Sequence, residues 1–106
     1  MRIAVMGLGG VGGVFGAKLA NAYAGKGEHE VVFFARGAHL EAIRREGLTL
    51  AAADGTIKAR PDLATDRPGE AGKLDLVLFC VKGYSLGEAA AQIKGSLREK
   101  AAVIPL

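Results

Sequence analysis

The stretch Arg2-Ile3-Ala4-Val5-Met6-Gly7-Leu8-Gly9-Gly10-Val11-Gly12 opens the chain and decides its fold. Residues 2–6 form a short apolar run with a β-branched bias, which is typical of a strand buried on both faces. After the glycines, apolar residues recur at helical spacing until Gly25 and Gly27 end the pattern. The residues with this spacing are Val14, Phe15, Leu19 and Ala22. The opening therefore predicts a strand, a tight glycine turn and a helix.

Strand-like and helix-like segments alternate along the rest of the chain. Apolar runs that predict strands cover residues 30–35, 74–81 and 101–106. Helical patterns cover residues 39–46 and a segment from a capping Ser85 to about Arg98. This alternation predicts an α/β fold of the Rossmann type, with a doubly wound, mainly parallel sheet in three layers, α/β/α. We expect residues 1–106 to form one domain.

The middle of the chain is less regular. Asp54-Gly55 is a turn signal between two short apolar segments, and it predicts a small antiparallel hairpin within residues 48–58. The polar stretch from Pro61 to Gly72 carries Pro68-Gly69 and predicts a surface loop.

Composition narrows the classes of function. The chain has 106 residues, half of them hydrophobic, and a net charge of +3. Basic residues are scattered among acids and do not interleave with aromatics, so we expect no nucleic-acid partner. No apolar run approaches the roughly 20 residues that span a bilayer, so we expect no membrane contact. The first strand begins without a signal peptide, which favours a cytoplasmic protein.

The cysteine and histidine residues of the sequence indicate neither a metal site nor a catalytic thiol. The single cysteine, Cys80, excludes an internal disulfide and a multi-cysteine zinc site. Cys80 lies inside an apolar run, which favours an inert core thiol over a nucleophile. His29 and His39 have no partner at ligand spacing, so we expect both at the surface and no metal site.

The glycine turn points to a dinucleotide. Gly7, Leu8, Gly9, Gly10, Val11 and Gly12 match GxGxxG between a buried strand and a helix. Gly7 permits the tight turn, Gly9 lets the backbone approach a pyrophosphate, and Gly12 allows close packing of helix on strand. Free N–H groups at the helix start would face the phosphates. The alternative interpretation is that the glycines only ease strand–helix packing.

Arg36 and Lys82 extend the predicted site. In dinucleotide folds, an acid at the tip of the second strand binds the ribose 2′-hydroxyl of NAD. Here that strand ends Phe34-Ala35-Arg36, and a guanidinium suits the 2′-phosphate of NADP. Lys82 follows the strand at 74–81 and would face the cleft at the carboxyl ends of the strands. The alternative for each is an ordinary solvent-facing cation.

With these motifs, and with Val81-Lys82-Gly83-Tyr84, the chain resembles the N-terminal domain of ketopantoate reductases, the 2-dehydropantoate 2-reductases of pantothenate biosynthesis. The resemblance implies that residues 7–12 bind the NADPH pyrophosphate, that Arg36 binds its 2′-phosphate and that Lys82 lies beside the cofactor. It also implies an NADP-dependent oxidoreductase whose partners are NADPH and a small 2-keto acid. A homodimer is compatible with the sequence.

The chain also departs from that family. The proton-donating lysine and the substrate-anchoring residues belong to a helical domain that is absent here, so we expect no catalytic residue in these 106 residues. A Gln-Asn-Gly segment expected just beyond Leu106 is missing too. We expect a fragment or separate domain that binds cofactor weakly and catalyses nothing alone. The alternatives are the nucleotide-binding domain of another two-domain dehydrogenase, such as an opine or 3-hydroxyacid type, and a non-catalytic NAD(H)-sensing module.

Overall fold

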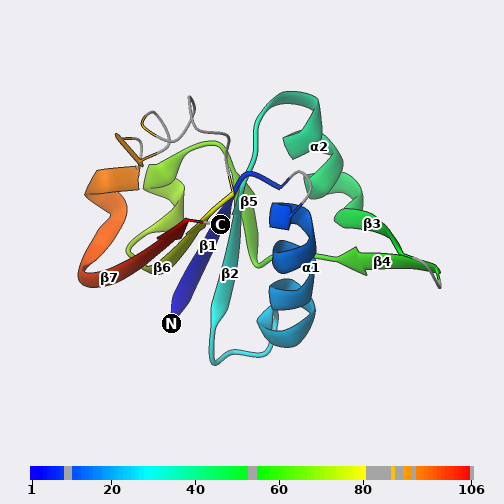
Figure 1. Ribbon diagram of the computed structural model, residues 1–106, viewed down its shortest axis with the longest axis horizontal. Coiled ribbons are helices and arrows are strands. Elements are labelled where there is room, and N and C mark those ends of the chain that lie inside the picture. The colour runs from blue at the N-terminus through cyan, green and yellow to red at the C-terminus, as the bar shows by residue number, and fades with distance from the viewer. Residues whose placement is uncertain (9–10, 53–54, 81–86, 88–89, 92, 106) are drawn as a thin grey trace.

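Five parallel strands form the central sheet of the computed structural model, which describes residues 1–8, 11–52, 55–80, 87, 90, 91 and 93–105 (Figure 1). The strands are β1 (Arg2–Met6), β2 (Glu30–Phe34), β5 (Leu63–Thr65), β6 (Leu74–Phe79) and β7 (Leu97–Pro105). Their order across the sheet is β5-β2-β1-β6-β7. The chain thus builds outward from β1 in both directions, which is the doubly wound arrangement that the sequence predicts.

Layers on both faces of the sheet complete the fold. One face carries α1 (Val11–Tyr23), α2 (Gly37–Glu46) and a hairpin of β3 (Leu48–Ala52) and β4 (Gly55–Ala59). The other carries the short 3-10 helices η1 (Pro68–Ala71) and η2 (Lys94–Ser96), together with Gly87, Ala90, Ala91 and Ile93, which are helical. Figure 1 shows the two groups on opposite sides of the strands. The prediction of a three-layer α/β/α fold is confirmed, and so is the antiparallel hairpin.

Alternate residues of the strands fill two separate cores. In β2, Val31 and Phe33 pack under α1 and α2, whereas Val32 and Phe34 face the η1 side. Val5 in β1 belongs to the first core and Met6 to the second. Because both faces are covered, these strands have no polar alternation, and their continuous apolar sequence follows from that burial.

The apolar residues whose spacing predicts α1 are not the ones that the helix buries. Val14 and Phe15 are each 44% exposed. The buried side of α1 consists of small residues, which are Gly13, Gly16, Ala17 and Ala20. An added Cβ would lie 2.7 Å from the Leu8 carbonyl oxygen at Gly13 and 3.3 Å from the Phe33 ring at Gly16. At Gly13 the contact is with backbone, so an added Cβ would force the helix to shift, and at Gly16 it would press on neighbouring side chains; the helix therefore lies close against β1 and β2.

The prediction of a surface loop from Pro61 to Gly72 is wrong in part. Residues 63–65 form β5, which pairs with β2, and the Thr65 side chain is fully buried. Asp62 anchors the start of β5, because its carboxylate accepts hydrogen bonds from the backbone N–H groups of Gly25 at 2.9 Å and Val31 at 2.7 Å. So short a strand has too few apolar residues to show a pattern, and its neighbours fix it.

The prediction of a helix that runs to about Arg98 is also wrong at its end. The described helical residues reach Ile93, η2 follows, and β7 begins at Leu97, opposite Leu74. The charged residues 98–100 resemble the wet side of a helix, yet they lie on an edge strand where charge is also exposed. Ser85, the predicted cap, lies outside the described residues.

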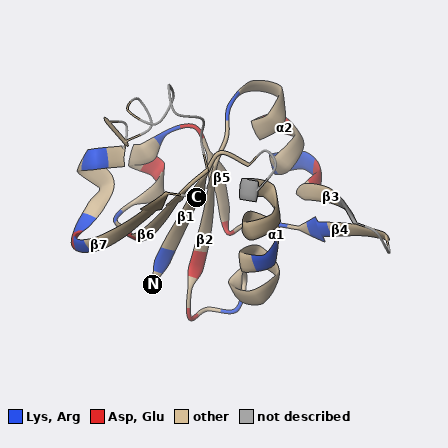
Figure 2. Cartoon of the chain, viewed as in Figure 1, with Lys and Arg blue, Asp and Glu red and all other residues tan. Residues whose placement is uncertain are grey.

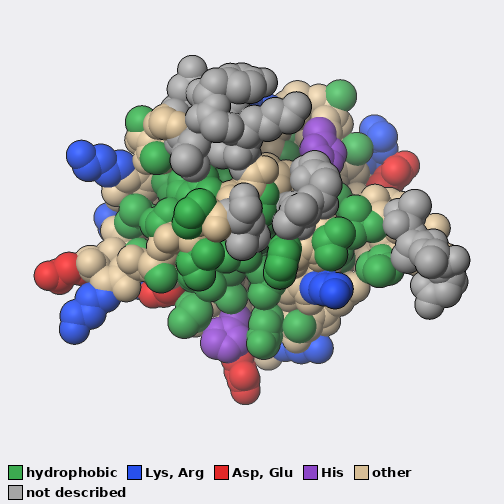
Figure 3. Space-filling model, viewed as in Figure 1, with side chains coloured by type: hydrophobic (Ala, Val, Ile, Leu, Met, Phe, Trp, Pro, Cys, Tyr) green, Lys and Arg blue, Asp and Glu red, His purple; other side chains and the backbone are tan. Residues whose placement is uncertain are grey.

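Hydrophobic side chains remain exposed on one side of the molecule. Figure 3 shows them gathered on the surface between β7 and α1. On β7, Val103 is 45% and Ile104 is 43% exposed. In the described part of the chain no helix is long and apolar enough to cross a membrane.

Asp75 ties the starts of β1, β6 and β7 together and makes stability depend on pH. The Asp75 carboxylate accepts a hydrogen bond from the backbone N–H of Arg2 at 2.7 Å and pairs with Arg98 Nε at 2.9 Å. The backbone hydrogen bond from Arg2 is the largest cause of a lowered pKa of Asp75; desolvation opposes it, and the charge of Arg98 lowers the pKa further.

A lowered pKa in the folded state means that the Asp75 carboxylate stabilises the fold above its unfolded pKa and ceases to do so as the pH falls through the folded value. We expect Asp75→Asn to lower the free energy of unfolding at pH 7, and we expect this difference to shrink as the pH falls below about 4, the usual pKa of an aspartate. Urea unfolding of both proteins across this pH range measures it. A difference that stayed constant down to about pH 2 would contradict the role of the charge.

The glycine contact between α1 and the sheet gives a second prediction. Gly13→Ala places a methyl group against the Leu8 carbonyl oxygen and should destabilise the protein by about 1–3 kcal/mol. Gly87→Ala is the matched control, because Gly87 is also helical and an added Cβ there meets none of the described residues within 4 Å. Thermal or urea unfolding should show a loss for the first variant and none for the second. Equal effects would mean that the close approach is not rigid.

Candidate functional site

The turn between β1 and α1 lies at the carboxyl edge of the sheet. Gly7 has φ of 86°, a left-handed conformation that favours glycine. Leu8 is buried, and its side chain packs in the core beneath α1. Val11 and Gly12 are the first residues of α1, while Gly9 and Gly10 lie outside the described residues.

The start of α1 suits an anion. Its first turn carries no acidic residue. The first N–H groups of a helix have no partner within the helix, and the helix dipole adds a partial positive charge there. A phosphate at this end would meet hydrogen-bond donors and no carboxylate of the first turn. The described residues of the turn therefore fit the pyrophosphate of a dinucleotide.

Strand register brings the separate parts of the site to one level. Met6 at the end of β1 pairs with Phe34 of β2 on one side and with Phe79 of β6 on the other. The pairing with β6 continues, because the Cys80 N–H donates to the Met6 carbonyl at 2.8 Å. Gly7 and the residues that follow β2 thus leave the sheet side by side.

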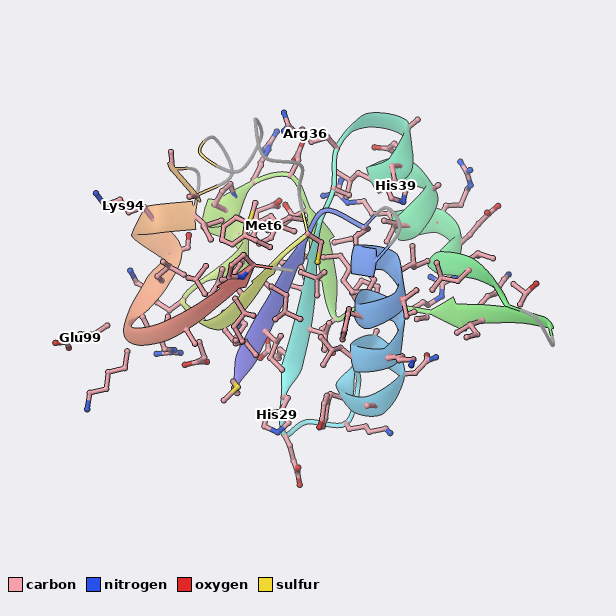
Figure 4. The ribbon with its side chains drawn as sticks, in the orientation of Figure 1. Met6, His29, Arg36, His39, Lys94 and Glu99 are labelled. Carbon is pink, nitrogen blue, oxygen red and sulfur yellow. The ribbon has the colours of Figure 1, made fainter. Side chains whose placement is uncertain are left out.

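Arg36 follows the end of β2 and occupies the N-cap position of α2. Its backbone is extended, with φ of −135° and ψ of 159°, and its side chain makes no capping hydrogen bond. The residue is exposed, and within the described ranges its guanidinium forms no ion pair. Figure 4 shows Arg36 at the same end of the sheet as Met6, with His29 at the opposite end. Arg36 is therefore available to an anion at the carboxyl edge.

A hollow of about 470 Å³ opens beside this edge, between α2 and the segment that joins β5 to η1. Gly37, directly after Arg36, contributes to its wall. The other lining residues are Leu40, Glu41, Arg44, Asp66, Arg67 and Glu70. Sequence analysis did not single out this hollow, since it treats the residues after Pro61 as loop.

The structure bears differently on the predictions for Lys82, Cys80 and the two histidines. Lys82 lies outside the described residues, so its place by the cofactor stays a prediction. Cys80 is half-buried, and desolvation raises the pKa of its thiol, which disfavours the nucleophilic thiolate. His39 is exposed as expected, but His29 is half-buried, with its ring edge-on to Tyr23 at 5.0 Å between ring centres.

Neither a metal centre nor a basic surface stands out. Among the residues that the structure describes, no three His, Cys, Asp or Glu side chains gather in a way that could hold a metal ion. Figure 2 shows Lys and Arg scattered on both sides of the sheet and interspersed with acids.

The sequence motifs do not include the two glycines that let α1 pack closely on the sheet. Gly13 and Gly16 lie just after the GxGxxG motif and, with Ala17 and Ala20, form a stripe of small residues at helical spacing. That stripe is visible in the sequence. The larger Val14 and Phe15 also have helical spacing, and their stronger apolar signal points to the wrong side of the helix.

Comparison with known proteins agrees with this geometry. Residues 3–106 match the family described as Ketopantoate reductase PanE/ApbA. The 2-dehydropantoate 2-reductase of Mesorhizobium japonicum is 38% identical over 106 residues, which are 100% of this chain and 31% of that protein. The uncharacterized oxidoreductase YkpB of Bacillus subtilis is 32% identical over 105 residues, 99% of this chain and 32% of that protein.

A solved structure is similar over the whole chain. The 2-dehydropantoate 2-reductase of Porphyromonas gingivalis is 43% identical, with a TM-score of 0.86, over 100% of this chain and 38% of that one. The chain spans about a third of the length of the relatives that it matches. The family match over nearly every residue and the shared fold lead to one conclusion: this chain belongs to the ketopantoate reductase family.

Proposed function

We propose that this chain is the NADPH-binding domain of a 2-dehydropantoate 2-reductase, which reduces the ketone of 2-dehydropantoate to the alcohol of pantoate. The observation that carries the proposal is the glycine turn between β1 and α1, matched with Arg36 at the end of β2, in a chain of this family. Bound NADPH would supply the hydride, and the protein supplies position and a proton.

The residues of this chain have binding roles in the proposal. Gly7, Leu8, Gly9, Gly10, Val11 and Gly12 hold the pyrophosphate through backbone N–H groups at the start of α1. Arg36 binds the 2′-phosphate with its planar guanidinium, and Lys82 lies beside the cofactor near the substrate. Residues outside this chain provide the proton donor and hold the 2-keto acid.

The setting of the protein is part of the same proposal. We infer a cytoplasmic protein that acts in pantothenate biosynthesis, with NADPH and a small 2-keto acid as its partners and without nucleic acid or membrane. A homodimer is compatible with it. An NAD(H)-sensing module is the competing class, and it differs in one measurable property, because such modules usually carry an acid where this chain has Arg36.

Cofactor preference tests the proposal directly. A ligand that binds only the folded form raises its stability, by about 2.7 kcal/mol at 100 times the dissociation constant. NADPH should raise the melting temperature more than NADH at equal concentration. Arg36→Ala should weaken NADPH binding about tenfold or more and leave NADH binding nearly unchanged, because only NADPH carries the 2′-phosphate.

Arg45→Ala is the matched control for that variant. Arg45 lies on α2, the helix that Arg36 caps; its side chain is 69% exposed and forms an ion pair with Glu46 at 3.6 Å. Its removal lowers the net charge equally and should leave the preference for NADPH intact. A wild-type protein that bound NADH better than NADPH would reject the proposal in favour of the sensor or another dehydrogenase.

The glycine turn gives a further prediction. Gly7→Ala forces a side chain into a left-handed backbone and should cost about 1–2 kcal/mol of stability. Gly25→Ala is the matched control, because Gly25 has φ of 75° in open space at the other end of α1. Both variants should lose similar stability in urea unfolding, but only Gly7→Ala should weaken NADPH and NADH binding together. Equal binding by the two variants would place the pyrophosphate elsewhere.

A further inference from the structure

Two arginines leave neighbouring strands of the sheet at the same level. β2 and β5 are parallel, with Phe34 opposite Thr65. Their pairing continues one step further, because the Ala35 N–H donates to the Thr65 carbonyl at 3.2 Å. Arg36 and Arg67 each come two residues after the Phe34–Thr65 pair. Since paired strands lie about 4.8 Å apart, the two backbones begin side by side at the carboxyl edge.

Hydrogen bonds with Thr65 and Glu70 fix the backbone at Arg67. Its N–H donates to Thr65 Oγ1 at 3.0 Å, and the Thr65 hydroxyl donates in turn to the Glu70 carboxylate. The Glu70 N–H closes the turn on the Arg67 carbonyl at 3.0 Å. Thr65 is fully buried, and Pro68 restricts Arg67 to its extended conformation. Arg67 therefore starts from a fixed point, as Arg36 does at the cap of α2.

Within the part of the chain that the structure describes, Arg36 and Arg67 also share the lack of a side-chain partner. The other arginines each make a hydrogen bond or an ion pair; these are Arg2, Arg44, Arg45, Arg60 and Arg98. Within the described residues, neither guanidinium of the pair at the carboxyl edge makes any such contact, and both residues are exposed. Two guanidinium groups of like charge at one edge, with no carboxylate bound, suit an anion with two negative charges.

The charges nearby explain why one arginine would be insufficient. Gly37 and Arg67 line the same hollow of about 470 Å³, and Glu41, Asp66 and Glu70 line it too. Glu70 accepts a hydrogen bond from the Thr65 hydroxyl, and Asp66 stands next to Arg67 in the chain, so both carboxylates oppose an anion at this place. A phosphate beside Asp66 would be repelled unless a second cation were present. Arg44 also lines the hollow, but its Nε donates to the Ala64 carbonyl at 3.1 Å, so Arg67 is the cation of this hollow that has no hydrogen-bonding partner within the described residues.

We propose that Arg67 determines cofactor specificity together with Arg36, and that the two guanidinium groups bind the ribose 2′-phosphate of NADPH between them. This inference rests on the proposed function, since it deepens the same binding site. Arg36 binds from the cap of α2 and Arg67 from the cap of η1. The segment from Pro61 to Gly72, which the sequence presents as an ordinary loop, thereby contributes a residue that separates NADP from NAD.

Calorimetric titration of NADPH and NADH into the protein and its variants tests the inference. Arg67→Gln should weaken NADPH binding about tenfold and change NADH binding less than about twofold, because the lost contact is to the 2′-phosphate alone. The dependence of NADPH affinity on salt should also become shallower, since one charge fewer faces the phosphate. Arg45→Gln removes an equal charge from an exposed position on α2 and should leave both affinities and the salt dependence unchanged.

Each contrary result has a definite meaning. An Arg67→Gln protein with unaltered NADPH affinity, while Arg36→Ala loses its preference for NADPH, would overturn the role of Arg67 and leave the proposed function standing. An equal loss for NADPH and NADH would also overturn it, because it would reveal a structural role. A wild-type protein that binds neither nucleotide would reject the proposed function itself. Within the described residues the Arg67 side chain forms no hydrogen bond or ion pair, so the variant should melt close to the wild-type temperature.

Discussion

The close approach of α1 to the sheet is the constraint on which the rest of the structure depends. Gly13 rests against the Leu8 carbonyl, where an added Cβ would lie at 2.7 Å, and Gly16 packs tightly against the Phe33 ring. This packing fixes the distance between α1 and the sheet, and that distance determines where the first N–H groups of α1 lie. The GxGxxG turn is therefore only the upper part of a longer glycine-dependent contact.

Parallel register carries that local contact across the molecule. Met6 is flanked by Phe34 and Phe79, and Phe34 is flanked by Thr65, so four strands end at one level. Residues far apart in sequence consequently meet at one edge, where peptide N–H groups and side chains are free of the sheet. The two cores below this edge consist of hydrophobic side chains, whereas the edge has free N–H groups and charged side chains that can bind a polar ligand.

Much of the fold was open to prediction because its signals are local and repeated. Buried strands such as residues 2–6 are continuous apolar runs, and a glycine cluster before a helical pattern has few other structural explanations. Arg36 could be singled out because its position is fixed by counting from the end of a strong strand. The same reasoning failed at β5 and at the start of β7. There, pairing with a neighbouring strand decides the structure, and the local sequence carries too little apolar signal to show it.

Because the sequence does not predict β5, it also does not predict that Arg67 belongs to the candidate site. A segment interpreted as loop has no register, and without register there is no reason to place Arg67 beside Arg36. Once Thr65 is known to lie opposite Phe34, both arginines occupy equivalent positions on adjacent strands. The choice between NADP and NAD would then depend on residues that follow two adjacent strands, whereas a sequence motif describes the end of one strand. In this chain Arg36 stands where NAD-binding sheets carry an acid at the end of β2. A second arginine after β5 can then strengthen the preference for the 2′-phosphate. The glycine turn, which holds the rest of the nucleotide, need not change.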